Sequence, residues 1–248
     1  MIPACACAAI LAATALGAPL QPEPIRVLIV TGGHDFEREA FFDIFRAMPG
    51  VSFREVAHPA SDALFKLQAA RSYDVLLLYD MWPSLSQQAQ GDLLRLLRQG
   101  KGVVALHHCL AGYPDWPEYQ RILGGRYFQK PHTENGVTLP PSNYRHGVAF
   151  QVHVVDPKHP VTRGLKDFDI VDETYHGLAV DAEVTPLLTT SEPSSSPVIA
   201  WTHRYGASQV VTIALGHDHT AYLNPAFRTL LRQAIFYVAP KKTPNDGR

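Results

Sequence analysis

Side chains that bind metals or transfer protons gather directly after several apolar segments of this 248-residue sequence. The segment Gly102-Val-Val-Ala-Leu-His-His-Cys predicts a buried strand that ends in His107, His108 and Cys109. These side chains can coordinate a metal, move protons or attack carbonyls. Ligands of open α/β sheets bind beyond the carboxyl ends of the strands, so we expect these residues to face a ligand there.

A His-x-His spacing in His217-Asp-His219 indicates a second chemical cluster. In an extended conformation both imidazoles point the same way, and neutral imidazole suits Zn, Mn or Ni. We therefore expect a divalent ion as the candidate cofactor, with His34, His107 and His217 as candidate ligands. Glu173 could also complete such a site.

Aromatic rings and carboxylates follow the first cluster, at Trp116, Glu118 and Tyr119. Such combinations commonly hold a sugar, although packing at the start of a helix explains them equally well. A second aromatic and acidic group, Asp172-Glu-Thr-Tyr-His, follows a predicted strand that carries Ile170. The pair Gly32-Gly33 lets backbone amides face a ligand, but it is no GxGxxG fingerprint, so no nucleotide cofactor is expected.

Cys109 allows a nucleophilic interpretation, since a thiolate near histidines can attack a carbonyl. A buried free cysteine explains the same position. The remaining histidines His58, His146 and His153 lack polar sequence neighbours and are interpreted as structural, and His159-Pro160 as a turn.

Apolar runs and turn residues predict the elements that must position these side chains. Strands are expected at residues 25–31, 51–56, 73–79 and 102–106, with helices from Asp35 to Ala47 and from Ser84 or Ser86 to Gly100. This alternation predicts right-handed crossovers and a flavodoxin-like, doubly wound, mostly parallel sheet. The strands at 25–31, 73–79 and 102–106 should be neighbours inside it.

The C-terminal half of the sequence predicts a less regular elaboration of that sheet. We expect a long ordered loop at 127–143, strands at 148–155 and 185–189, and a hairpin of 198–205 with 209–215. Asn224 should cap a final amphipathic helix.

The first 18 residues are uncharged and apolar and end in small residues, which is typical of a cleaved signal peptide. They lack the Lys or Arg that signal peptides usually carry near the N-terminus. Cleavage would remove Cys5 and Cys7 and leave Cys109 without a disulfide partner. We expect a secreted or periplasmic protein with one domain at residues 25–239, a polar tail at 240–248 and no membrane association of the mature chain. A net charge of −1 gives no electrostatic reason to bind nucleic acid, and a homo-oligomer is compatible with the sequence.

Taken together, the motifs resemble the ThuA-like family, which is named for a trehalose-utilisation protein and has a class I glutamine amidotransferase-like fold. The resemblance spans about residues 25–239. It rests on the segments Val30-Thr-Gly-Gly-His-Asp-Phe, Val103-Val-Ala-Leu-His-His, Trp116-Pro-Glu-Tyr, His159-Pro-Val-Thr-Arg-Gly-Leu, Asp172-Glu-Thr-Tyr, Val198-Ile-Ala-Trp-Thr-His-Arg-Tyr-Gly and Leu215-Gly-His-Asp-His. The family usually has Leu in place of Thr174, and His107 stands where amidotransferases place their nucleophilic cysteine, so glutamine hydrolysis is not supported.

The resemblance implies an enzyme that processes carbohydrates, particularly 3-keto disaccharides or glycosides. Acid–base chemistry, such as isomerisation or elimination, would need a base next to the sugar carbonyl. The catalytic residues that we expect are His107, Glu173 and Asp218, with His107 or Glu173 as the base. The expected sugar-binding residues are Gly33, His108, Trp116, Tyr119 and Tyr175.

We expect His34, His107, Glu173 and His217 to converge in one crevice, although they are far apart in the sequence. Two alternatives stay open at this point. The protein could bind sugar without catalysis, or it could be a hydrolase that uses Cys109.

Overall fold

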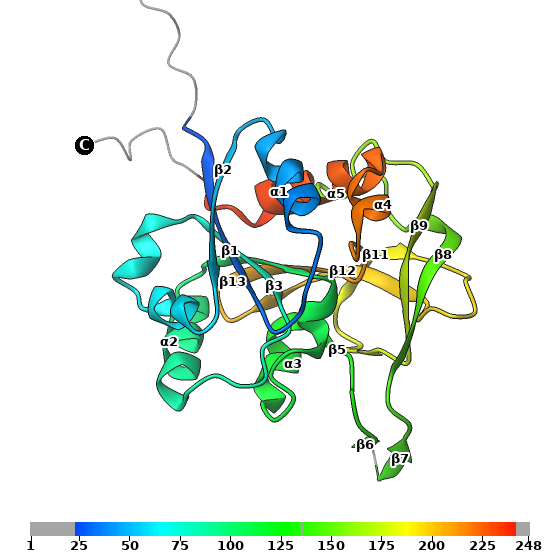
Figure 1. The fold of residues 1–248 in the computed structure, drawn as a ribbon, viewed down its shortest axis with the longest axis horizontal. Helices are drawn as coiled ribbons and strands as arrows, with labels where there is room; N and C mark the ends of the chain where they lie inside the picture. The colour runs from blue at the N-terminus through cyan, green and yellow to red at the C-terminus, as the bar shows by residue number, and fades with distance from the viewer. Residues whose placement is uncertain (1–22, 135, 242–248) are drawn as a thin grey trace, which may run out of the picture.

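The structure, a computed structural model, describes residues 23–134 and 136–241, and a nine-stranded sheet runs through this part of the chain (Figure 1). The strand order is β2-β1-β3-β4-β13-β12-β11-β8-β9. The parallel part consists of β1 (Ile25–Gly32), β2 (Val51–Ala57), β3 (Val75–Asp80), β4 (Gly102–Leu106) and β13 (Ser208–Ile213). The antiparallel part consists of β12 (Val198–Tyr205), β11 (Thr185–Thr189), β8 (Asn143–Val154) and β9 (Phe168–His176).

Helices cover both faces of the parallel part, with α1 and α5 on one side and α2 and α3 on the other (Figure 1). The helices are α1 (Arg38–Arg46), α2 (Gln87–Arg98), α3 (Pro117–Leu123), α4 (His219–Tyr222) and α5 (Pro225–Val238). Three short 3₁₀ helices are η1 (Ala60–Phe65), η2 (Ala69–Ser72) and η3 (His107–Ala111). The doubly wound α/β prediction is confirmed, and β1, β3 and β4 are neighbours as expected.

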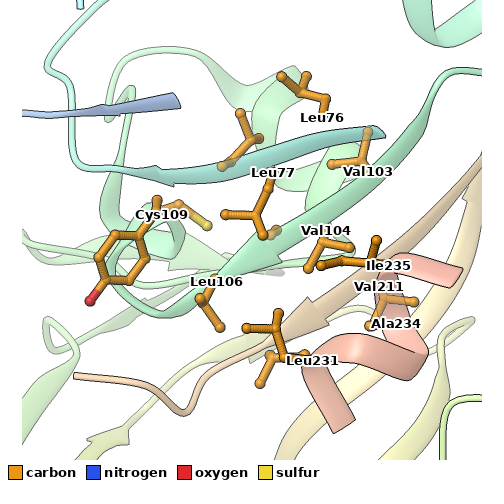
Figure 2. Packing of buried hydrophobic residues seen from close by; sticks show 14 of the residues in the cluster. Leu76, Leu77, Val103, Val104, Leu106, Cys109, Val211, Leu231, Ala234 and Ile235 are labelled. Carbon is orange, nitrogen blue, oxygen red and sulfur yellow. The ribbon is translucent and has the colours of Figure 1, made fainter. Parts of the chain in front are cut away.

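The core lies where β3, β4 and β13 meet α5 (Figure 2). Every residue of β3 and β4 is buried, as their unbroken apolar sequences predict for strands covered on both faces. Burying one such aliphatic side chain contributes about 1.5–3 kcal/mol. The residues that follow β4 are therefore attached to a buried, well-packed strand. Core side chains labelled in Figure 2 include Leu76, Leu77, Val103, Val104, Val211, Leu231, Ala234 and Ile235.

Two of the three predicted helix starts are confirmed. Ser86 caps α2 by accepting a hydrogen bond from the backbone of Ala89, and Asn224 caps α5 in the same way. The prediction that Asp35 begins the first helix is wrong. That helix begins at Arg38 without a side-chain cap, because the carboxylate of the preceding Glu37 binds His219 instead.

Residues 127–143, predicted as a loop, contain a small β-hairpin, so that prediction is wrong in part. The hairpin is formed by β6 (His132–Glu134) and β7 (Val137–Leu139), and it extends away from the large sheet (Figure 1). Its two strands have three residues each, which is too short for an alternating pattern to reveal them in the sequence. A further short pair joins β5 (Gly125–Arg126) to β10 (Ala179–Val180).

No helix in the described part of the chain is long and apolar enough to cross a membrane. The predicted leader at 1–18 and residues 242–248 of the predicted tail lie outside the described residues.

Gly33→Ala should destabilise the fold, whereas Gly91→Ala should not. Gly33 has a φ of 81°, and an added methyl group would collide with the backbone carbonyl of Met81. The left-handed conformation alone costs roughly 1–2 kcal/mol for a residue with a Cβ. Gly91 lies inside α2 with room for a methyl group, and Ala is favoured there by about 0.8–1.0 kcal/mol. Urea unfolding of both variants measures the difference, and equal stabilities would contradict the backbone account.

Candidate active site

His107 lies immediately after β4 in a conformation that side chains rarely adopt, with a φ of 53°. Its Nδ1 lies 2.8 Å from the carbonyl oxygen of Ala214. A carbonyl can only accept, so Nδ1 carries the proton and the lone pair of the neutral ring is on Nε2. The strand and this hydrogen bond together aim Nε2 at the space beyond the sheet.

His217 reaches the same place from the loop after β13. Its Nδ1 lies 3.2 Å from Nε2 of His107. Gly216, with a φ of 108°, allows the turn that separates the histidine from the strand. Burial, followed by the neighbouring His107, lowers the pKa of His217, so the ring is neutral near pH 7.

Glu173 is contributed by β9, not by a loop after a strand as the sequence indicated. Its side chain is 6% exposed; Oε1 lies 3.4 Å from Nε2 of His107, and Oε2 lies 3.8 Å from Nδ1 of His217. Burial would raise the pKa of Glu173, but the imidazoles of His107, His217 and His146 outweigh it and lower that pKa. The carboxylate is therefore ionised at neutral pH.

The neighbouring Asp172 attaches β9 to the loop that carries His217. Its fully buried carboxylate accepts hydrogen bonds from the backbone N–H groups of Gly216 (2.7 Å), His217 (3.0 Å) and Glu173 (2.8 Å). Burial raises the pKa of Asp172 to about 6, although His107 and these donors act in the opposite direction. Asp172 is thus a positioning residue that the sequence analysis did not single out for a role.

The three ligand atoms offered by His107, Glu173 and His217 all lie within 4.8 Å of one another. Ligands on a tetrahedral ion with bonds of about 2.0–2.1 Å are separated by about 3.3–3.4 Å. The separations of 3.2 and 3.4 Å from Nε2 of His107 are close to that spacing. Two imidazoles and one carboxylate also form a donor set that Zn and related divalent ions accept. The residues present therefore fit a divalent metal; we call them the triad.

Tyr175 lies against the triad as the sequence analysis expected. Its hydroxyl is 3.0 Å from Nε2 of His107, and its ring stacks on the same imidazole. Burial, followed by the charge of Glu173, raises the pKa of Tyr175 well above its usual value. The phenol therefore stays protonated and can donate a hydrogen bond.

His34 and His108 lie beside the triad without joining it. The ring of His34 stacks on His108 with centroids 4.5 Å apart and lies 6.2 Å from His217. Burial, followed by His107, holds the pKa of His108 well below its usual range, so its ring is neutral. Both residues line the pocket, and the group of potential ligand atoms within 4.8 Å of one another includes Glu173 but not His34.

His146 is the residue of this site that the sequence interpretation missed. Its Nδ1 lies 2.6 Å from Oε2 of Glu173, and its side chain is 60% exposed. The register of β8 and β9 shifts between Arg145 and Val148, and this bulge directs the imidazole toward Glu173. Gly147 was the available signal, because a glycine next to a strand often marks a bulge.

The interpretation of His58 and His153 as histidines without polar partners is also wrong. The buried His58 contacts Asp62, Asp80 and the hydroxyl of Tyr113, and His153 pairs with Asp167. Asp80, Tyr113 and Asp167 are distant in sequence from their histidines, but Asp62 lies only four residues after His58 and was a local signal for a polar partner. Both lie outside the pocket at the triad.

Six predicted site residues do not line this pocket. Two of them, His107 and His217, lie next to it through their contacts with the lining residue Glu173. Tyr119 is fully buried in the core, and the half-buried Trp116 stacks on it, so packing explains both rings. Gly33 is needed for its close approach to Met81. Asp218 caps α4 by accepting from Thr220; burial would raise its pKa, but these hydrogen bonds outweigh that effect and lower it.

Cys109 is part of the hydrophobic core and does not face the pocket (Figure 2). It is fully buried, and burial raises the pKa of its thiol well above the usual value, with Asp80 adding to the effect. A protonated, inaccessible thiol is not a nucleophile. The structure therefore argues against the hydrolase alternative.

Of the triad, Glu173 lines a pocket of about 410 Å³. This size accommodates a small polar molecule such as a sugar unit. The pocket is lined by His34, Met81, His108, Ala111, Tyr127, Gln129, Pro141, Ser142, Tyr144, His146, Glu173 and Tyr175.

Fold and site together define a flavodoxin-like α/β protein with a histidine–carboxylate cluster beyond its strands. The family model for ThuA, described as trehalose utilisation, matches residues 26–238, and the chain belongs to this family. No curated protein sequence matches the chain significantly.

Solved structures show the same fold at low sequence identity. A thua-like protein from Parabacteroides merdae ATCC 43184 has a TM-score of 0.73 at 20% identity, with 90% of this chain and 94% of that chain covered. A thua-like protein from Bacteroides uniformis ATCC 8492 has a TM-score of 0.66 at 18% identity, with the same coverage of 90% and 94%. A cytoplasmic protein from Salmonella typhimurium has a TM-score of 0.60 at 11% identity, covering 88% of this chain and all (100%) of that chain.

Asp172→Asn should destabilise the protein, because the amide would present N–H groups to backbone N–H donors. Leaving a buried donor without an acceptor costs roughly 1–3 kcal/mol. Asp169→Asn is the matched control, since Asp169 is exposed on the same strand, and its effect should stay within about 0.5 kcal/mol. Urea unfolding measures both variants. A stability of Asp172→Asn equal to that of the control would refute the positioning role.

Proposed function

We propose that this protein is an enzyme that processes carbohydrates by metal-assisted acid–base chemistry at the triad. The observation that carries the proposal is the convergence of Nε2 of His107, Nδ1 of His217 and the carboxylate of Glu173 within 4.8 Å. The three side chains come from separate parts of the chain, and one of them, Glu173, lines a pocket of about 410 Å³. A carbohydrate substrate is supported by membership of a family described by trehalose utilisation.

The roles of the triad follow from its donor atoms. His107, His217 and Glu173 would hold a divalent ion such as Zn, Mn or Ni. When bound, such an ion supplies a Lewis acid that polarises a carbonyl oxygen. The hydrogen bond from Nδ1–H of His107 to Ala214 supports this role, since ligating histidines usually donate their other N–H to an oxygen acceptor.

Two further side chains can handle protons at the same pocket. Tyr175 keeps its proton at neutral pH and can donate a hydrogen bond to a developing oxyanion. His146 is exposed and contacts the triad through Glu173, so it can exchange a proton with a bound sugar. Removal of a proton next to the carbonyl of a 3-keto sugar, followed by isomerisation or elimination, would use these groups.

Replacing triad residues should abolish metal binding and turnover while the protein stays folded. The informative variants are His107→Asn, His217→Ala and Glu173→Gln; Asn tolerates the positive φ of His107 better than Ala does. Loss of a residue that hydrogen-bonds a metal ligand typically lowers metal affinity by roughly 10–100-fold. Loss of a ligand itself should lower the affinity for Zn or Mn by more than that. His153→Ala, which removes an exposed imidazole outside the pocket, should change neither property.

Equilibrium dialysis with elemental analysis measures the metal, and a panel of 3-keto and ordinary disaccharides measures turnover. Unchanged metal content in all three variants would refute the metal role of the triad. A metal-loaded wild type that binds sugars but converts none of them would instead support the non-catalytic sugar-binding alternative.

A further inference from the structure

The outer wall of the pocket is formed by the segment between β5 and β8 and by the start of β8. Tyr127 and Gln129 lie on its outgoing part, and Pro141 and Tyr144 lie on its returning part. The β6–β7 hairpin between them extends away from the sheet (Figure 1). The triad and the outer wall thus come from different structural elements.

Tyr144 is the most exposed large apolar side chain of this wall, with 58% of its surface accessible. It is the cross-strand partner of Tyr175, so it lies next to the triad along β8. Its ring also packs edge-on against His146 with centroids 5.0 Å apart. An accessible aromatic ring beside polar groups is a surface on which the C–H face of a sugar ring can stack.

We propose that Tyr144 is a specificity-determining residue that stacks a glycosyl unit of the substrate. This inference rests on the proposed function and adds a residue to it. The stacked ring would bind through Tyr144, while the reacting carbon would face the triad.

Calorimetric titration of the metal-loaded full chain with trehalose, sucrose and lactose tests the proposal. At least one of these neutral sugars should bind. Tyr144→Ala should weaken the neutral sugar roughly three- to tenfold, whereas Tyr144→Phe should bind like the wild type because it keeps the ring. Phe236→Ala removes another exposed aromatic outside the pocket, and it should have no effect.

With any sugar that is turned over, Tyr144→Ala should raise KM and leave kcat nearly unchanged. This is the effect of losing a contact that is equally strong in the ground state and in the transition state. Equal binding of a sugar by the wild type and by Tyr144→Ala would overturn the inference, and so would failure of all three neutral sugars to bind. Metal binding at the triad is unaffected by these outcomes, so failure of this inference is distinguishable from failure of the proposed function.

Discussion

The arrangement of the site depends on the carboxylate of Asp172. β9 is the last strand of the sheet, three strands beyond β12, yet its residue Glu173 must reach the histidines that follow β4 and β13. Asp172 closes this gap by accepting backbone hydrogen bonds from Gly216 and His217. A fully buried acceptor with these donors orients β9 and the loop together, because any other arrangement would leave polar groups unsatisfied. The two halves of the triad are thereby fixed relative to each other.

The second requirement is a rigid support for His107. Burial of β4 on both faces and the packing of α5 hold the strand in place, so the unusual backbone of His107 is imposed by its surroundings. The same packing buries Cys109 two residues later. At the end of β4, the imidazole of His107 therefore contacts the other triad residues, whereas the thiol of Cys109 is buried in the core. This arrangement favours metal-assisted over thiol-based chemistry.

Most of the parallel sheet could be predicted from the sequence, because unbroken apolar runs such as β3 and β4 have few alternatives. His107 and His217 could be predicted as site residues from their place at strand ends. His146 was missed, because a β-bulge decides where its side chain points, and the adjacent Gly147 was the one sequence signal for that bulge. Tyr119 and Trp116 were predicted as sugar-binding residues, because aromatic side chains serve both in packing and in sugar binding. Only their burial in the folded structure shows that these two rings pack against each other.

We propose that three side chains from distant parts of the chain form one metal site. Anomalous diffraction from crystals soaked in Zn or Co salts would locate the ion. A peak is expected about 2.0–2.3 Å from Nε2 of His107, Nδ1 of His217 and a carboxylate oxygen of Glu173. A well-occupied peak at other residues, with none at the triad, would contradict it.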